Sequence, residues 1–233
     1  MTLTNDALYW FCSLPASQVP PGTRYRFLLN DDVEVIDPAA RGVQDGGSLK
    51  TSFGENPADP STSWSTIIDV AAVSAASHVQ PWQTMGWQNF LLYEVHARRF
   101  TNLNPGALTP LELLADELST ASRLGKPGYL RQLPATVLGL MPVNEFSSAA
   151  SWGYDPSYYF AIDSFYGGAA ALARLVNAAH AAGRGVTLDL VYNHSLGSSL
   201  MSIAPDVYRN GDYDGDRMNC GHPMAGGCTA PSV

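Results

Sequence analysis

The pattern of hydrophobic and polar positions in residues 1–80 predicts short β-strands and no amphipathic helix. Runs of β-forming residues lie between turn residues at 8–12, 25–29, 33–36 and 66–70. The second and third runs are separated by Asn30, Asp31 and Asp32, which tolerate the backbone of a tight turn, so these two runs predict a hairpin. We expect residues 1–80 to form a small all-β domain or a part of one.

From about residue 90 the pattern changes to alternating strands and helices. Apolar runs at 90–95, 136–143 and 185–191 predict buried strands, and the segments between them have helical spacing. Strands that are apolar on both faces, in the order strand, helix, strand, helix, strand, favour a parallel sheet or barrel. Residues 195–233 show no strong period and predict loops.

Start and stop signals support both helices. Thr109, Pro110 and Glu112 combine an N-cap residue, a proline at the first helical position and a glutamate three residues after the cap. The second helix is expected over residues 168–182, because Gly183 stands just past its end, where helices often terminate in a left-handed glycine.

Charge and composition exclude several classes of function. The 233 residues carry 13 Lys and Arg against 21 Asp and Glu, a formal net charge of -8, so we expect no nucleic-acid partner and no attraction to an anionic membrane. No apolar run approaches the ~20 residues of a spanning helix. Three sparse cysteines and an N-terminus without a signal-peptide pattern favour a cytoplasmic protein.

Polar residues gather where the predicted strands end, which is where α/β folds collect functional groups. Glu94 and His96 stand at the end of the first strand, and Glu145 follows the second. Asp189 is unusual because it lies inside the apolar run of the third strand, where an unpaired carboxylate is costly to bury. It either pairs with a buried Arg or backbone donors, or joins Asn193 and His194 in a polar cluster suited to hydroxyl-rich ligands.

Four segments resemble the α-amylase family of glycoside hydrolases (family 13). Asp189-Leu190-Val191-Tyr192-Asn193-His194 is similar to the third-strand motif of that family. Segments similar to its first strand, second strand and following loop agree in order and spacing; they are Leu92-Tyr93-Glu94-Val95-His96, Leu140-Met141-Pro142-Val143-Asn144-Glu145-Phe146 and Ser151-Trp152-Gly153-Tyr154-Asp155-Pro156. The segment with Tyr25-Arg26-Phe27 and residues 37–41 resembles the immunoglobulin-like domain that precedes the barrel in branching enzymes, isoamylases and trehalohydrolases.

The resemblance implies a fold and a reaction. Residues 81–233 would hold about strands 1–3 of an incomplete (β/α)8 TIM barrel, and residues 1–80 would form part of an immunoglobulin-like β-sandwich. The implied activity is that of a retaining hydrolase or transglycosylase of α-1,4- or α-1,6-linked glucans such as glycogen or starch, with a carboxylate nucleophile and a carboxylic acid/base. The expected partner is an α-glucan or maltooligosaccharide, and the oligomeric state stays open.

The resemblance also implies substrate-binding residues. Tyr154 would be the aromatic platform under the sugar, His194 would bind its 6-hydroxyl, and Asp189 would support the site. Trp152 is a candidate for sugar stacking or for core packing. Asn193 corresponds to a calcium ligand in many α-amylases, but branching-type members often lack this ion, so we predict no metal and no cofactor.

The family's catalytic carboxylates belong to its fourth and fifth strands, and the resemblance places both beyond Val233. We therefore predict no catalytic residue in this sequence, and we expect a truncated or frame-shifted reading of a longer enzyme that is inactive alone. The alternative is a non-catalytic glucan-binding fragment or pseudoenzyme.

Other features favour structural roles. Residues 212–216 lack the glycine and glutamate of an EF-hand, and Cys220, His222 and Cys228 lack the close cysteine spacing of a zinc site. His180 suits the last turn of a helix. Aromatic residues of β-rich segments usually belong to the core, and this expectation covers Trp10, Trp64, Trp82 and Trp87.

Overall fold

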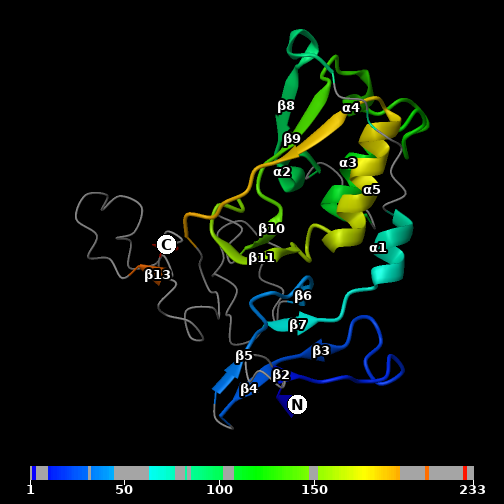
Figure 1. Ribbon diagram of the computed structural model, residues 1–233. Helices are drawn as coiled ribbons and strands as arrows, with labels where there is room; N and C mark the ends of the chain where they lie inside the picture. Colours follow the sequence, from blue (N-terminus) through cyan, green and yellow to red (C-terminus); the bar gives the residue numbers. More distant parts are fainter. Residues whose placement is uncertain are drawn as a thin grey trace.

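The computed structural model describes the backbone of residues 2–3, 10–30, 33–44, 63–76, 82, 85–101, 108–146, 152–194, 208–209 and 228–229. Its central feature is a parallel sheet in the order β12-β9-β8 (Figure 1). The strands are β8 (Leu92–Val95), β9 (Val137–Leu140) and β12 (Gly185–Leu188). All three predicted strands are thus confirmed, and β12 is shorter than its apolar run because it ends before Asp189.

The three strands end at the same level. Val95 and Leu188 both pair with Leu140 of the middle strand. In the same register, Glu94 and Thr187 flank Gly139. Side chains alternate between the two faces of a strand, so Glu94, Thr187 and the next residue but one, Asp189, belong to the same face of the sheet.

Two helices cover the other face of the sheet (Figure 1). They are α3 (Pro110–Glu117), which starts as predicted but ends before the Gly125-Lys126-Pro127-Gly128 stop signal, and α5 (Gly168–Ala181), which is close to its predicted bounds. Leu111, Leu114 and Leu175 are fully buried in the core between them and the sheet. The Glu112 carboxylate accepts hydrogen bonds from the Thr109 N–H (3.0 Å) and hydroxyl (2.9 Å), which confirms the N-terminal signal of α3.

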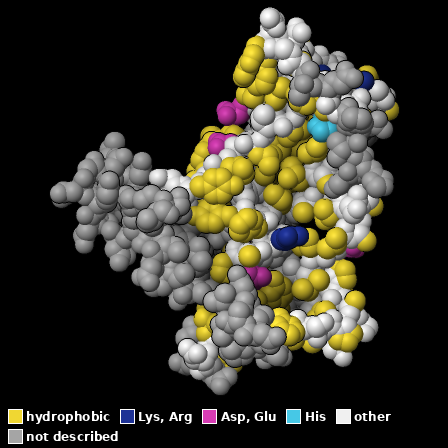
Figure 2. Space-filling view, viewed as in Figure 1, with side chains coloured by type: hydrophobic (Ala, Val, Ile, Leu, Met, Phe, Trp, Pro, Cys, Tyr) yellow, Lys and Arg dark blue, Asp and Glu magenta, His cyan; other side chains and the backbone are white. Residues whose placement is uncertain are grey.

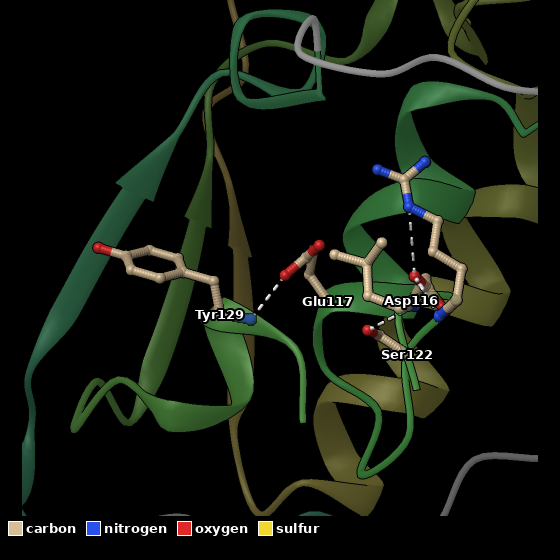
Figure 3. A network of polar contacts seen from close by, with 6 residues as sticks. Asp116, Glu117, Ser122 and Tyr129 are labelled. Atoms are coloured by element: carbon tan, nitrogen blue, oxygen red, sulfur yellow. Dashed lines mark hydrogen bonds and ion pairs between the residues drawn. The ribbon is translucent and has the colours of Figure 1, made fainter. Parts of the chain in front are cut away.

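A short helix, α4 (Tyr129–Gln132), follows α3 and was not predicted. Side chains at the end of α3 and in the turn that follows it hold α4 and the turn in place (Figure 3). The Glu117 carboxylate accepts the Tyr129 N–H at 2.6 Å, and Asp116 accepts the Arg123 N–H at 3.0 Å. Ser122 accepts the N–H of the residue after Arg123 at 3.3 Å. Four residues are too few for a periodic pattern, so these tertiary hydrogen bonds take its place.

An antiparallel pair, β10 (Asn144–Phe146) and β11 (Pro156–Ile162), lies beyond the carboxyl end of β9. Glu145 in β10 is only 1% exposed, and its carboxylate accepts the Ser164 N–H at 2.9 Å. A buried carboxylate requires such partners, so Glu145 ties the end of β11 to β10. The loop between the two strands contains Tyr154.

The N-terminal part consists of small antiparallel sheets, which lie below the parallel sheet in Figure 1. Their strands are β1 (Thr2–Leu3), β2 (Trp10–Phe11), β3 (Arg24–Tyr25), β4 (Phe27–Leu29), β5 (Val33–Val35), β6 (Val43–Gln44) and β7 (Trp64–Thr66). The β4–β5 hairpin is confirmed, with Phe27 opposite Val35 and Asn30 in a left-handed conformation. The small sheets do not confirm an immunoglobulin-like sandwich.

The run at 66–70 was wrongly predicted as a strand. β7 ends at Thr66, and a helix, α1 (Val70–Ala76), begins at Val70. The Asp69 carboxylate accepts the Ala72 N–H at 2.8 Å, which is the hydrogen bond of a helix N-cap. Aspartate at this position therefore ends the strand pattern and starts a helix.

The remaining elements are short. They are η2 (Trp87–Asn89), α2 (Ala97–Thr101), β13 (Tyr208–Arg209) and β14 (Cys228–Thr229). Trp87 is 86% exposed, so the expectation of a core position is wrong for this residue. Leu92 of β8 is 43% exposed. Hydrophobic side chains are visible on the surface in Figure 2 over the part of the molecule that holds the parallel sheet. In the described part of the chain, no helix has both the length and the apolar character needed to cross a membrane.

Removal of the Leu114 side chain tests the core between the sheet and α3. Leu114 is 0% exposed, so we expect Leu114→Ala to lower the free energy of unfolding by about 2–5 kcal/mol, through lost burial and the cavity that remains. Urea denaturation followed by circular dichroism measures the change. Leu124→Ala is the matched control, because Leu124 is 63% exposed and its loss has little effect. Equal effects of the two substitutions would contradict this core.

Candidate functional site

The site is formed where the β10–β11 loop meets the end of β12. The Tyr154 hydroxyl donates a hydrogen bond to the Asp189 carboxylate at 2.8 Å, across 35 residues of sequence. Asp189 is half-buried and lies just after β12, so the expectation that it is buried inside the strand is wrong. Its N–H still bonds to the Leu140 carbonyl at 2.9 Å, which fixes the backbone that carries the carboxylate.

His194 bonds to the backbone of Tyr154, whereas Asp189 bonds to its side chain. Its Nε2 lies 2.7 Å from the Tyr154 carbonyl, and its Nδ1 lies 3.2 Å from the Asn193 amide nitrogen. A carbonyl only accepts, so Nε2 carries the proton and, in the neutral ring, Nδ1 accepts from Asn193. The Tyr159 hydroxyl donates to the His194 carbonyl at 3.2 Å and holds the backbone of this residue.

The electrostatics of the site keep the Tyr154 phenol protonated. The hydrogen bond to Asp189, partial burial and the negative charges of Asp189 and Glu94 raise the pKa of Tyr154 to about 12. Glu94 thus acts on the site, although it was noted only as a residue at the end of the first strand. Glu94 is in register with Thr187, two residues before Asp189, and all three belong to the same face of the sheet. This relation could have identified Glu94, but it can be recognised only when the strand register is known.

A turn of unusual backbone conformation precedes Tyr154. Trp152 and Gly153 have φ angles of 60° and 91°, which are left-handed. The Trp152 ring meets the Arg99 guanidinium, 5.4 Å from the ring centre, and the edge of the His96 ring at 5.5 Å. Burial lowers the pKa of His96, and the charges of Arg99 and Arg98 lower it further, so this imidazole is neutral at pH 7.

Four of the five predicted residues form one hydrogen-bonded group: Tyr154 contacts Asp189 and His194, and Asn193 contacts His194. Trp152 precedes the group but contacts Arg99 and His96 instead. An exposed aromatic face beside a carboxylate, an amide and an imidazole offers both stacking and hydrogen bonds, which is the combination that a sugar ring requires. The substrate-binding roles of these residues stay predictions.

A metal site was not predicted, and among the residues with described side chains no three His, Cys, Asp or Glu groups are placed to hold an ion. Residues 212–216, Cys220 and His222 lie outside the described residues, and of Cys228 only the backbone is described.

Comparison with known proteins bears on the family. Residues 122–203, which include β9, the β10–β11 pair, α5 and β12, match the family profile "Alpha amylase, catalytic domain". A malto-oligosyltrehalose trehalohydrolase of Saccharolobus solfataricus is 29% identical over 197 residues, which are 84% of this chain and 30% of that protein. These findings support membership of this region in the α-amylase family of glycoside hydrolases. The resemblance inferred from the four sequence segments is therefore confirmed.

Two further α-amylase family proteins extend the comparison. A glycogen debranching enzyme of Erwinia tasmaniensis is 28% identical over an alignment of 264 positions, gaps included, that covers 93% of this chain and 39% of that enzyme. The structure of a pullulanase from Anoxybacillus sp. LM18-11, complexed with maltotetraose, superposes with a TM-score of 0.59 at 22% identity, covering 84% of this chain and 30% of that one. The likeness supports the fold of an incomplete TIM barrel. The chain spans about a third of the length of these relatives.

The first prediction for this α-amylase family site concerns the Tyr154 phenol. Asp189→Asn removes the negative charge, so we expect the pKa of Tyr154 to fall from about 12 toward the ordinary value of about 10. Because the folded-state pKa is raised, the stabilisation from this proton is complete below about pH 10 and is lost as pH rises through about 12. Nuclear magnetic resonance of ¹³Cζ-labelled tyrosine, with Tyr154→Phe to assign the signal, measures the titration.

Asp116→Asn is the matched control, because Asp116 contacts the Arg123 backbone in the α3–α4 turn. This control should leave the Tyr154 titration unchanged. A Tyr154 signal that titrates at the same pH in Asp189→Asn and in the unsubstituted protein would contradict the hydrogen bond.

Proposed function

We propose that this chain forms the sugar-binding side of the active site of an α-glucan hydrolase. The observation that carries the proposal is the bond of 2.8 Å between Tyr154 and Asp189, with His194 on the Tyr154 carbonyl, at the carboxyl ends of parallel strands. In this position a glucose ring would stack on the Tyr154 face and contact the polar groups at its edge.

Each polar group has a distinct part in the proposed binding. Asp189 uses one carboxylate oxygen for Tyr154, which leaves the other to accept a sugar hydroxyl. Both ring nitrogens of His194 are engaged, so a sugar hydroxyl reaches His194 by replacing a partner. The Asn193 amide, at 3.2 Å and exposed, is the weaker partner, and a hydroxyl that donates to Nδ1 would take its place.

The names of the relatives support the substrate class. Trehalohydrolase, debranching enzyme and pullulanase all act on glucans or maltooligosaccharides by name, and the pullulanase structure holds maltotetraose. We propose α-1,4- or α-1,6-linked glucan as substrate, in the cytoplasm, and retention as the stereochemical course. Retention requires a nucleophile and an acid/base about 5–5.5 Å apart, and we propose that neither is among the described residues.

Glucan binding without hydrolysis is the second candidate function. It is favoured by the state of Asp189, since a carboxylate that accepts the Tyr154 phenol serves as a structural acceptor rather than a free nucleophile. Binding and hydrolysis must therefore be measured separately.

Maltotetraose is the probe for binding by the 233-residue chain, with isothermal titration calorimetry as the measurement. We expect Tyr154→Ala to weaken binding by about tenfold or more, which is about 1.4 kcal/mol, because the stacking face is lost. Tyr154→Phe keeps the face and loses only the bond to Asp189, so its effect should be smaller. Trp87→Ala removes an exposed aromatic ring from η2, before β8, and should bind like the unsubstituted protein.

Release of reducing sugar from maltotetraose or glycogen by the same preparation decides between the two candidates. Binding without release favours the second candidate, and release contradicts the proposal that the catalytic pair lies outside the described residues. Absence of binding by the folded protein would overturn the proposed function.

A further inference from the structure

The turn before Tyr154 adopts a conformation that its residues do not favour. Among the described residues with a side chain beyond glycine, only Asn30 and Trp152 have a positive φ. Asparagine visits this region readily, whereas for a bulky side chain it is a genuine outlier that other contacts must stabilise. Gly153 is equally restricted, because a Cβ there would lie 2.6 Å from the Pro142 carbonyl oxygen.

Two side chains from the end of β8 and the start of α2 hold the Trp152 ring. The Arg99 guanidinium lies over the ring, 5.4 Å from its centre, and the His96 ring meets it edge-on at an interplanar angle of 82°. Both contacts are favourable, because a cation prefers an aromatic face and rings prefer an edge-to-face arrangement. Trp152 is nevertheless 43% exposed, so the surrounding core does not enclose its ring.

His96 packs against the core, and it also holds the backbone of Arg99. His96 Nδ1 accepts the Arg99 N–H at 3.3 Å, and the His96 ring packs against the buried Tyr166 at 6.4 Å. The contact therefore connects the end of β8 to the turn at Trp152 and Gly153.

The turn determines where Tyr154 lies. Tyr154 is 39% exposed, and two hydrogen bonds hold it: its hydroxyl bonds to Asp189 and its carbonyl to His194. Tyr154 can form both bonds only if the backbone after Trp152 runs toward Asp189 and His194. The left-handed conformations of Trp152 and Gly153 give the backbone this direction. A relaxed, extended backbone at Trp152 would redirect the next residues and separate Tyr154 from its partners.

We propose that Trp152 is a positioning residue: its ring, held between Arg99 and His96, fixes the left-handed turn that places Tyr154 against Asp189 and His194 before any sugar binds. Trp152 thus acts through Tyr154 and does not serve as a second stacking platform. The value of this arrangement for glucan binding rests on the proposed function, but the positioning itself is measurable without a sugar.

The test follows the Tyr154 phenol in the sugar-free, 233-residue chain by ¹³Cζ-tyrosine resonance, assigned with Tyr154→Phe. In Trp152→Ala the bond to Asp189 should be lost for much of the time, so the pKa of Tyr154 should fall from about 12 toward about 10. Trp152→Phe keeps an aromatic ring for Arg99 and His96 and should restore most of the raised value. Trp87→Ala, the matched exposed tryptophan, should leave the titration unchanged.

A folded Trp152→Ala protein whose Tyr154 titrates at the original pH would overturn the proposal, as would equal shifts in Trp152→Ala and Trp152→Phe. Circular dichroism reports whether Trp152→Ala folds. If it does not, Arg99→Met decides, because it removes only the guanidinium above the ring: a lowered Tyr154 pKa supports the proposal and an unchanged one refutes it. Maltotetraose binding separates the positioning role of Trp152 from the proposed function. If the Tyr154 pKa shifts as expected but the unsubstituted protein does not bind maltotetraose, only the proposed function is refuted.

Discussion

The register of the parallel sheet is the constraint on which the rest of the molecule depends. Val95, Leu140 and Leu188 are paired in register, so the three strands end together and the residues that follow them lie at the same edge of the sheet. The apolar faces of α3 and α5 stabilise this register because they bury the side chains on one face of the sheet. A slip of one residue would turn Glu94 and the carboxylate of Asp189 to the opposite face.

A second constraint comes from the β10–β11 pair, which continues the chain beyond the sheet and returns it to α5. Its stability requires that the nearly inaccessible Glu145 be satisfied, and the Ser164 N–H supplies part of that requirement. The loop of this pair is consequently anchored on both sides. Tyr154 can then meet a residue 35 positions later with the geometry of a short hydrogen bond.

The sequence supports prediction where one pattern dominates and fails where tertiary contacts decide. The periodic segments of α3 and α5 and the apolar runs of β8, β9 and β12 follow from local rules. α4 and the start of α1 depend instead on single carboxylates, Glu117 and Asp69, that bind backbone N–H groups. The left-handed conformation of Trp152 has no local signal at all, because its stabilisation comes from Arg99 and His96, more than fifty residues earlier.

The candidate site was predictable as a set of residues but not as a network. The resemblance to the α-amylase family singled out Tyr154, Asp189 and His194, yet it could not show that Tyr154 bonds to both of the others, one through its hydroxyl and one through its carbonyl. This arrangement has a consequence for ligand binding. Because the phenol and the imidazole are already oriented by protein partners, a ligand need not order them, and the entropic cost of binding falls on the ligand itself. Under the proposed function, a sugar hydroxyl that approaches His194 must replace one of its protein partners, and a ligand hydroxyl that takes the place of the Asn193 amide would satisfy this requirement.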